Sequence, residues 1–384
     1  MSAPAAKRAR TDGAVVTSRV SAHCALANPK LVIEEFPATE TCVSTVAAAR
    51  KACADCVSGA DDRVMVIVGP CSIHDTQSAM EYAKRLKVEA DKYKNELVII
   101  MRVYFEKPRT TVGWKGLIND PYMDNSYRMN DGLRIGRKLL RDINDMGLPC
   151  GAELLDMISP QYIEDLVSWA AIGARTTECQ THRELASSVG MPVGFKNGTS
   201  GDVGVAIDAI QSAGSPHHFF GVTEHGAAAL VHSSGNDTAH VVLRGGKVGP
   251  NYEEKNVMEA YAALEKKGLK RGVVVDCSHG NSLKNHKNQP KVNTDICEQI
   301  KKGNPIAGVM IESHLFEGNQ GLPKDEELKK MQQTTYELGV SPVLKAGVLK
   351  YGVSITDACV DWPTTLAMLA PLAEAVKAKR AAKK

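Results

Sequence analysis

Short apolar runs recur along the chain and are separated by longer segments with helical periodicity. The runs are nearly continuous in valine and isoleucine, without alternating polar positions, which is typical of strands covered on both faces. The nine candidate strands are 64–69, 97–103, 151–155, 172–175, 192–196, 218–223, 240–244, 273–278 and 307–313. The helical patterns include 77–94, 132–146, 160–170 and 202–213. Repeated β-α units of this kind predict an α/β fold, a (β/α)8 barrel of the TIM type.

Nine candidates are one more than an eight-stranded barrel needs. Either 218–223 or 240–244 is then accessory to the barrel. The glycine-containing link 235–237 indicates an inserted β-hairpin in this region.

The two ends of the chain are polar and basic and lack hydrophobic periodicity. We therefore expect a disordered tail over 1–20 and an N-terminal extension with an oligomeric or regulatory role over 21–62. The catalytic barrel is expected over 63–375, followed by a basic C-terminal tail over 376–384. The last helix is expected to begin near Thr356 and to fray into that tail.

Composition and charge exclude several classes of function. Apolar residues make up 43% and charged residues 24% of the chain, which is enough for a large core. The net charge of +3 is spread along the sequence, so we do not expect nucleic acid as a partner. No apolar run reaches the ~18 to 20 residues that span a bilayer, so we expect no membrane partner.

Ten cysteines are scattered without a repeated spacing. We interpret them as reduced thiols of an intracellular protein, and we expect a cytoplasmic location. Cys53 and Cys56 form a C-x2-C pair, but no second pair lies at zinc-finger distance. They are interpreted as two ordinary thiols on a helix.

Polar residues follow the predicted strands at their carboxyl ends, where barrel enzymes carry their catalytic groups. These residues are Cys71, Arg102, Glu153, Arg175, Lys196, Arg244, His279 and Glu312. A single charge at such a position can be a salt bridge at the rim. A whole ring of them is hard to explain by packing and indicates a site.

Six cations are expected to converge at this end of the barrel, and they need an anionic ligand because they would otherwise repel one another. They are Arg102, Lys107, Arg109, Arg175, Lys196 and Arg244. Arginine suits phosphate and carboxylate because its planar group donates two parallel hydrogen bonds. The K-P-R-T loop, 107–110, could hold a second phosphate, with a solvated basic loop as the alternative.

Four further residues could bind a metal ion if the fold brought them together: Cys71, His279, Glu312 and Asp357. A thiolate, an imidazole and two carboxylates suit a first-row divalent ion such as manganese, iron, cobalt or zinc. Their spacing alone does not establish the site, because a single histidine or cysteine is more often a packed residue than a ligand.

Several long motifs resemble one known family. They are G-P-C-S-I-H-D at 69–75, M-R-V-Y-F-E-K-P-R-T-T-V-G-W-K-G at 101–116, G-A-R-T-T-E at 173–178, G-F-K-N-G-T at 194–199, L-R-G-G at 243–246, I-E-S-H-L-F-E-G-N-Q at 311–320 and S-I-T-D-A-C at 354–359. In this order they are similar to type I 3-deoxy-D-arabino-heptulosonate-7-phosphate (DAHP) synthases. The similarity runs from about Arg19 to the last helix.

The resemblance implies condensation of phosphoenolpyruvate with erythrose 4-phosphate and water, the first step of the shikimate pathway. It implies a divalent metal held by Cys71, His279, Glu312 and Asp357, and a water placed by Glu153. Phosphoenolpyruvate would be bound by residues matching Arg102, Lys107, Arg175, Lys196 and Arg244. The phosphate of the sugar would lie on Arg109 and Thr110, beside the rigid Pro108. Lys107, Glu153 and His279 would be the catalytic groups, with Lys107 as the general acid.

Two alternatives remain open at this point. The sibling synthase that uses arabinose 5-phosphate has the same barrel and the same phosphoenolpyruvate chemistry. The family resemblance gives it an asparagine-containing loop where this chain has K-P-R-T. A barrel that has lost catalysis would usually lack a ligand or an arginine, and none is missing here.

The resemblance also implies feedback inhibition by an aromatic amino acid. The effector pocket would combine the N-terminal segment, with Arg19, and the accessory hairpin, with Phe219 and Gly221. Gly221 resembles tyrosine-sensitive members, so tyrosine is the expected effector. The segment 18–29 otherwise departs from the family pattern. A homodimer or homotetramer is expected, since closed symmetry is the default for soluble oligomers.

Overall fold

The structure is a computed structural model that describes residues 19–269 and 271–382. Eight parallel strands close into a barrel in the order β1-β10-β9-β8-β5-β4-β3-β2. The strands are β1 (Val64–Gly69), β2 (Leu97–Arg102), β3 (Cys150–Glu153), β4 (Trp169–Ile172), β5 (Val193–Lys196), β8 (His240–Leu243), β9 (Val273–Asp276) and β10 (Ile306–Glu312). The predicted (β/α)8 barrel is therefore confirmed.

The strands are buried along their whole length, which explains why their sequences are apolar without alternation. Inside the barrel, the fully buried Trp169 donates from Nε1 to Nε2 of His240 at 3.1 Å. Gly194 leaves room for this ring, because a Cβ there would lie 2.7 Å from it.

Helix α2 (Glu40–Ser58) packs against the apolar cluster inside the barrel. Its Cys53 and Cys56 are buried in this cluster with Met65 and Ile67 of β1. Burial is the main cause that raises the pKa of Cys56 to about 12. The C-x2-C pair thus consists of packed thiols on a helix.

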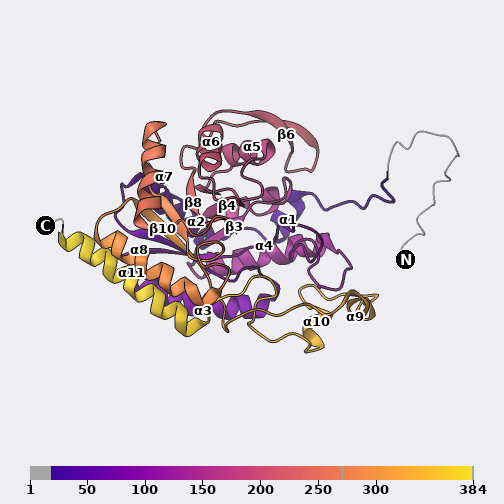
Figure 1. Cartoon of the computed structure of the whole chain (residues 1–384). Coiled ribbons are helices and arrows are strands. Elements are labelled where there is room, and N and C mark those ends of the chain that lie inside the picture. Colours follow the sequence, from indigo (N-terminus) through magenta and orange to yellow (C-terminus); the bar gives the residue numbers. More distant parts are fainter. Residues whose placement is uncertain (1–18, 270, 383–384) are drawn as a thin grey trace.

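Helices cover the outer face of the barrel (Figure 1). They are α3 (Thr76–Lys92), α4 (Met129–Asp145), α5 (Gln180–Ser188), α6 (Gly204–Ala213), α7 (Glu254–Lys266), α8 (Gln289–Lys301) and α11 (Trp362–Ala382). Shorter elements precede the barrel or follow its strands: α1 (Pro29–Glu35), η1 (Ser159–Tyr162), η2 (Glu164–Leu166), η3 (His286–Asn288), α9 (Asp325–Lys330) and α10 (Pro342–Lys345).

The prediction was wrong between β3 and β4. Instead of a helix over 160–170, the chain forms the two short 3-10 turns η1 and η2, and β4 begins at Trp169 rather than at Ile172. Trp169, Ala170 and Ala171 lack the β-branched residues that signalled most of the other strands. Burial of Trp169 inside the barrel overrides this weak local preference.

The end of the chain also differs from the prediction. Helix α11 begins at Trp362 rather than near Thr356, and it continues to Ala382 through most of the expected basic tail. Arg380 explains this, because its Nε and Nη2 donate to the Asp62 carboxylate at 2.8 and 2.6 Å. The basic residues therefore secure the helix to the start of the barrel domain.

A two-stranded antiparallel sheet lies outside the barrel between α6 and β8. It consists of β6 (His218–Val222) and β7 (Ala228–His232). The inserted hairpin is confirmed, and 218–223 is the accessory candidate. The link 235–237 follows the hairpin and is not its turn. The turn lies at 223–227, where Thr223 N–H donates to Ala227 O at 2.8 Å.

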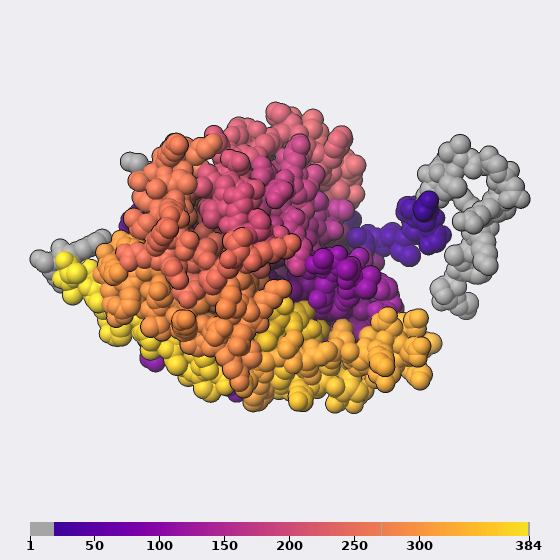
Figure 2. All heavy atoms as spheres, in the orientation of Figure 1, coloured from indigo at the N-terminus to yellow at the C-terminus, as the bar shows by residue number. Residues whose placement is uncertain are grey.

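The first described residues extend away from the main body before α1 (Figures 1 and 2). Most of the tail predicted over 1–20 lies outside the described residues, and Arg19 and Val20 are exposed without regular structure. Among the described helices, none is both long and apolar enough to cross a bilayer.

Candidate active site

A cavity of about 440 Å³ opens at the carboxyl ends of the barrel strands. Eleven of the residues predicted from the sequence line it: Lys107, Pro108, Arg109, Thr110, Glu153, Arg175, Lys196, Arg244, His279, Glu312 and Asp357. The other two connect to it directly. Arg102 Nη2 donates to Glu312 Oε1 at 3.2 Å, and Lys107 Nζ lies 3.0 Å from Cys71 Sγ. The fold thus brings together residues that are far apart in sequence.

Three of the four expected metal ligands form a tight set. The ligand atoms of Cys71, Glu312 and Asp357 all lie within 4.8 Å of one another. His279 lies at the edge of this set, with Nε2 at 3.9 Å from Glu312 Oε1. A thiol, an imidazole and two carboxylates facing one point fit the donor preferences of a first-row divalent ion.

The electrostatics of Cys71 also fit a bound cation. Burial, assisted by Glu312, raises the pKa of this thiol to about 12, although Lys107 acts in the opposite direction. Without a cation the thiol keeps its proton at neutral pH. A coordinated metal ion removes that proton, so the residues present fit the ion that the donor set indicates.

Asp276 orients the imidazole of His279, and the sequence analysis did not identify it. Its Oδ2 lies 2.9 Å from His279 Nδ1, so Nε2 faces Glu312. Burial would raise the pKa of Asp276, but His279 and the cations around it lower it far below its usual range. A carboxylate that fixes a histidine in this way is common behind metal ligands. The D-C-S-H spacing is the signal that could have revealed it.

Lys107 stays charged in spite of its burial. Burial would lower the pKa of its ammonium, but Cys71, Asp357 and Glu312 together raise it above the usual value. Its Nζ lies 3.0 Å from Cys71 Sγ and 3.8 Å from Asp357 Oδ2. The group is therefore a persistent cation held beside the metal-binding set.

Lys196 and Glu153 form a buried ion pair across the cavity, with Nζ and Oε2 3.2 Å apart. Burial would raise the pKa of Glu153, but Lys196, Lys107 and Arg102 lower it, so the carboxylate stays ionised. Arg102 is fully buried and lies over the ring of Tyr104 at 3.9 Å.

Arg244 has a buried Nε without a hydrogen-bond partner among the described residues. A buried cationic N–H without a partner is costly, so it indicates that an anionic ligand completes the site. Arg175 lines the same cavity. Arg109 and Thr110 are exposed at its mouth, where Arg109 Nε donates to Trp114 O at 2.8 Å.

Further polar residues line the cavity without having been predicted. Lys284 and His286 follow His279 on the loop after β9, and Asn319 comes from the loop after β10. Lys284 is a sixth cation in the lining, beside Lys107, Arg109, Arg175, Lys196 and Arg244. Lys284 and His286 lie five and seven residues beyond His279, and this spacing is not distinctive in the sequence.

The residues expected for an effector pocket lie in two neighbouring segments. Phe219 and Gly221 are on β6, opposite Val231 and Ala229 of β7. The N-terminal extension reaches the turn of this hairpin, where Lys30 N–H donates to Glu224 O at 2.8 Å. Arg19 lies farther out, in the exposed segment before α1.

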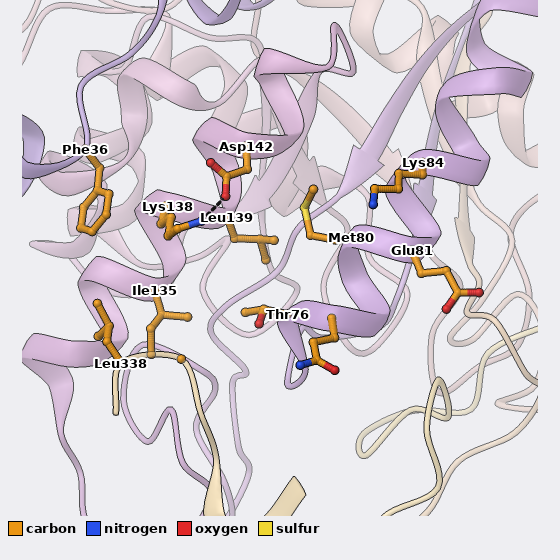
Figure 3. Close-up of a pocket in the computed structure, with 12 residues that line it drawn as sticks. Phe36, Thr76, Met80, Glu81, Lys84, Ile135, Lys138, Leu139, Asp142 and Leu338 are labelled. Atoms are coloured by element: carbon orange, nitrogen blue, oxygen red, sulfur yellow. Dashed lines mark hydrogen bonds and ion pairs between the residues drawn. The ribbon is translucent and has the colours of Figure 1, made fainter. Parts of the chain in front are cut away.

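A larger cavity of about 720 Å³ lies between α3 and α4 (Figure 3). Its side chains are mainly apolar, including Met80, Ile135 and Leu139, and Lys138 at its edge is paired with Asp142. None of the predicted site residues lines it. The smaller cavity is the candidate active site because it alone of the two holds the convergent cations and the metal-binding set.

Fold and site together define a class: a barrel enzyme whose site suits phosphorylated, anionic substrates and contains residues that fit a divalent metal ion. A model of the DAHP synthetase I family matches residues 39–370. The chain therefore belongs to the DAHP synthetase I family, and the family resemblance seen in the motifs is confirmed.

Several relatives are similar along nearly their whole length. The chain is 56% identical over 353 residues to "Phospho-2-dehydro-3-deoxyheptonate aldolase, Phe-sensitive" of Escherichia coli strain K12, covering 92% of this chain and 95% of the relative. It is 50% identical to the protein of Schizosaccharomyces pombe named "Phospho-2-dehydro-3-deoxyheptonate aldolase, tyrosine-inhibited", covering 94% and 93%. The solved structure of the aldolase from Francisella tularensis SCHU S4 superimposes with a TM-score of 0.87 at 49% identity, covering 94% of this chain and 99% of that one.

Proposed function

We propose that the 440 Å³ cavity is where this chain condenses phosphoenolpyruvate with erythrose 4-phosphate and water, giving 3-deoxy-D-arabino-heptulosonate 7-phosphate and phosphate. This is the first step of the shikimate pathway. The observation that carries the proposal is the ring of cations facing a metal-binding set at the carboxyl ends of the strands, in a chain of the DAHP synthetase I family.

Phosphoenolpyruvate carries a phosphate and a carboxylate, and the inner cations suit both. Arg102 and Lys196 are buried, and the half-buried Arg244 has an Nε without a hydrogen-bond partner among the described residues. Arg175 and Lys107 complete the site. Bidentate arginine contacts would fix the orientation of the enol ester. Glu153, held ionised by Lys196, orients the water that adds at carbon 2.

Cys71, His279, Glu312 and Asp357 would hold the divalent ion, which we propose to be manganese, iron, cobalt or zinc. When bound, it would supply Lewis-acid polarisation of the aldehyde. The role of Asp276 is to keep Nε2 of His279 directed toward the ligand set.

Erythrose 4-phosphate enters at the mouth, with its phosphate on Arg109 and Thr110 and with Pro108 stiffening the loop. Carbon 3 of phosphoenolpyruvate attacks the aldehyde carbon, and the Lys107 ammonium gives a proton to the new alkoxide. Water adds at carbon 2, and phosphate leaves as the carbon–oxygen bond breaks.

The test is phosphate release from phosphoenolpyruvate with either erythrose 4-phosphate or arabinose 5-phosphate, with and without a chelator. Release should require the four-carbon sugar and should stop with chelator and return with added metal. Preference for the five-carbon sugar would instead identify the sibling synthase. No release with either sugar, with metal present, would identify a barrel without catalysis.

We also propose tyrosine as the feedback effector, bound between the N-terminal extension and the hairpin. Relatives whose names state phenylalanine sensitivity and tyrosine inhibition both match this chain, so overall sequence identity does not identify the effector. A Cβ at position 221 would lie 2.6 Å from Val231 Cγ2, so this position controls the space beside β7. Tyrosine should inhibit most strongly, and Gly221→Ser should weaken that inhibition more than Gly221→Ala. Strongest inhibition by phenylalanine would refute this choice.

The chain is further proposed to act as a homodimer or homotetramer in the cytoplasm. The ten cysteines are free, which suits a reducing compartment. Light scattering of the purified protein would give the number of subunits.

A further inference from the structure

Cys179 differs from the other cysteines in its exposure. Eight of the ten thiols are buried, Cys24 is exposed in the N-terminal segment, and Cys179 is half-exposed. Only these two can meet a reagent without unfolding. Cys179 has no role in the chemistry proposed above, although it lies only four positions after Arg175.

The surroundings of Cys179 suit a reactive thiolate. The residue occupies the N-cap position of α5, and its sulfur lies 3.1 Å from Thr181 Oγ1. His182, on the first turn of the same helix, is only 8% exposed. Its Nε2 lies 2.8 Å from Leu155 O and therefore carries the ring proton.

The other ring nitrogen of His182 is then an acceptor. Nδ1 is buried and has no hydrogen-bond partner in the described part of the chain, and His182 is one of the groups that lower the pKa of Cys179. A cysteine beside a histidine with a free lone pair is the arrangement that activates thiol nucleophiles. The orphaned nitrogen points to a thiol that loses its proton.

The pKa of Cys179 agrees with this geometry. The hydroxyl of Thr181 contributes most, and with His182 and the N–H groups of the helix start it lowers the pKa to about 7 against the opposing effect of burial. By contrast, burial raises the pKa of Cys297 to about 11. Because the thiolate is the reactive form, a thiol reagent should react with Cys179 faster than with a buried thiol such as that of Cys297.

We propose that Cys179 is a site of reversible thiol modification by small disulfides such as oxidised glutathione. The Cys179 sulfur attacks one sulfur of the disulfide, a new S–S bond forms and the old one breaks. The departing glutathione thiolate takes up a proton from water. Cys179 is thereby oxidised to a mixed disulfide and one glutathione is reduced.

The modification would affect the active site by displacing the turn that precedes α5. In this turn Cys179 N–H donates to Thr176 O at 3.0 Å, and Thr177 Oγ1 donates to Lys196 O at 2.7 Å. Arg175 lies in the same turn. An adduct on the cap would displace the turn and weaken the binding of phosphoenolpyruvate. This consequence, unlike the modification itself, rests on the proposed function.

The experiment treats the reduced full-length protein with oxidised glutathione at pH 7 and maps the adducts by mass spectrometry. Wild type and Cys24→Ser should gain one glutathione on Cys179, which dithiothreitol removes, and Cys179→Ser should gain severalfold less. Equal or faster labelling of Cys24 would overturn the proposal. Site mapping does not require activity, so it is independent of whether the proposed function is right.

Two further measurements test the cause and the consequence. The rate of alkylation by iodoacetamide should reach half its maximum near pH 7 in wild type, and Thr181→Val should reduce the rate at pH 7 severalfold; an unchanged rate would contradict the assigned environment. The glutathione adduct should raise the KM for phosphoenolpyruvate severalfold, with kcat less affected. Cys179→Ser, treated in the same way, should keep its KM. An adduct without an effect on KM would limit Cys179 to a modification site without control over the enzyme.

Discussion

Lys107 shows how one residue can serve both halves of the site. Its ammonium contacts Cys71 Sγ and lies near Asp357, so its charge is held beside two expected metal ligands, while its side chain lines the substrate cavity. A residue that only balanced the charge of the ligands would matter for metal binding. A general acid would matter for turnover.

Lys107→Ala should separate these roles. We expect the variant to keep its metal content and to lose about 10²- to 10⁴-fold in kcat, the usual range for loss of a general acid. Elemental analysis and phosphate release measure the two quantities. Lys115→Ala, at an exposed position of the same loop, is the control and should behave as wild type. Unchanged turnover in Lys107→Ala would remove this lysine from the mechanism.

Asp276→Asn tests the support of His279. The amide lacks the negative charge that lies 2.9 Å from Nδ1, so the imidazole is less firmly oriented. Affinity for Mn²⁺ should fall about 10- to 100-fold, the usual effect of losing such a partner. Calorimetric titration of metal-free protein measures this directly. Asp237→Asn, at an exposed position, should have no effect; equal affinities in both variants would show that Asp276 does not support the ligand.

At the scale of the elements, the loops after β5 and β8 are held together by one buried amide. Asn197 Oδ1 accepts from Arg244 N–H at 2.8 Å and from Asn251 Nδ2 at 3.2 Å. Its Nδ2 donates to Gly245 O at 3.0 Å. The side chain thereby fixes where Arg244 leaves its strand. Loops can carry precise chemistry when rigid contacts of this kind position them.

Asn197→Ala should therefore raise the KM for phosphoenolpyruvate about tenfold, because Arg244 loses its fixed position. It should also lower the free energy of unfolding by about 1–3 kcal/mol, the cost of buried partners left unpaired. Asn293→Ala is the matched control, since this buried amide donates to Met368 O between α8 and α11. It should show a similar loss of stability with an unchanged KM. The same KM in both variants would show that Asn197 only stabilises the fold.

The barrel was predictable because most of its strands are buried on both faces and are therefore rich in valine and isoleucine, as β1, β2, β9 and β10 are. The ring of polar residues was predictable for a related reason, since parallel strands bring their carboxyl ends to one edge. β4 was misplaced because Trp169, Ala170 and Ala171 do not signal a strand locally. Asp276 and Asn197 were missed because their roles depend on contacts that the fold creates. The D-C-S-H spacing is a local signal for Asp276, but no local spacing links Asn197 to Arg244, 47 residues further along the chain.

For the whole molecule, buried titratable groups link stability to pH. Glu106 is 4% exposed and accepts a hydrogen bond from Ser159 Oγ at 2.8 Å. Burial raises the pKa of this carboxyl from 4.5 to about 7, although Ser159 acts in the opposite direction. Between these two values the folded state keeps a proton that the unfolded state has lost. Stability from this group is therefore present in acid and is lost as the pH rises toward 7.

Glu106→Gln should abolish this dependence, because the amide stays neutral and can still accept from Ser159. The variant should match wild type near pH 4.5 and become relatively more stable as the pH rises, by up to about 3 kcal/mol above pH 7. Urea unfolding at one protein concentration, at pH 5 and pH 8, measures the difference, and Glu326→Gln at an exposed position is the control. Other buried groups titrate equally in both proteins, so their contributions cancel in the difference in free energy of unfolding between variant and wild type. A difference that does not change with pH would mean that Glu106 is already ionised in the folded protein.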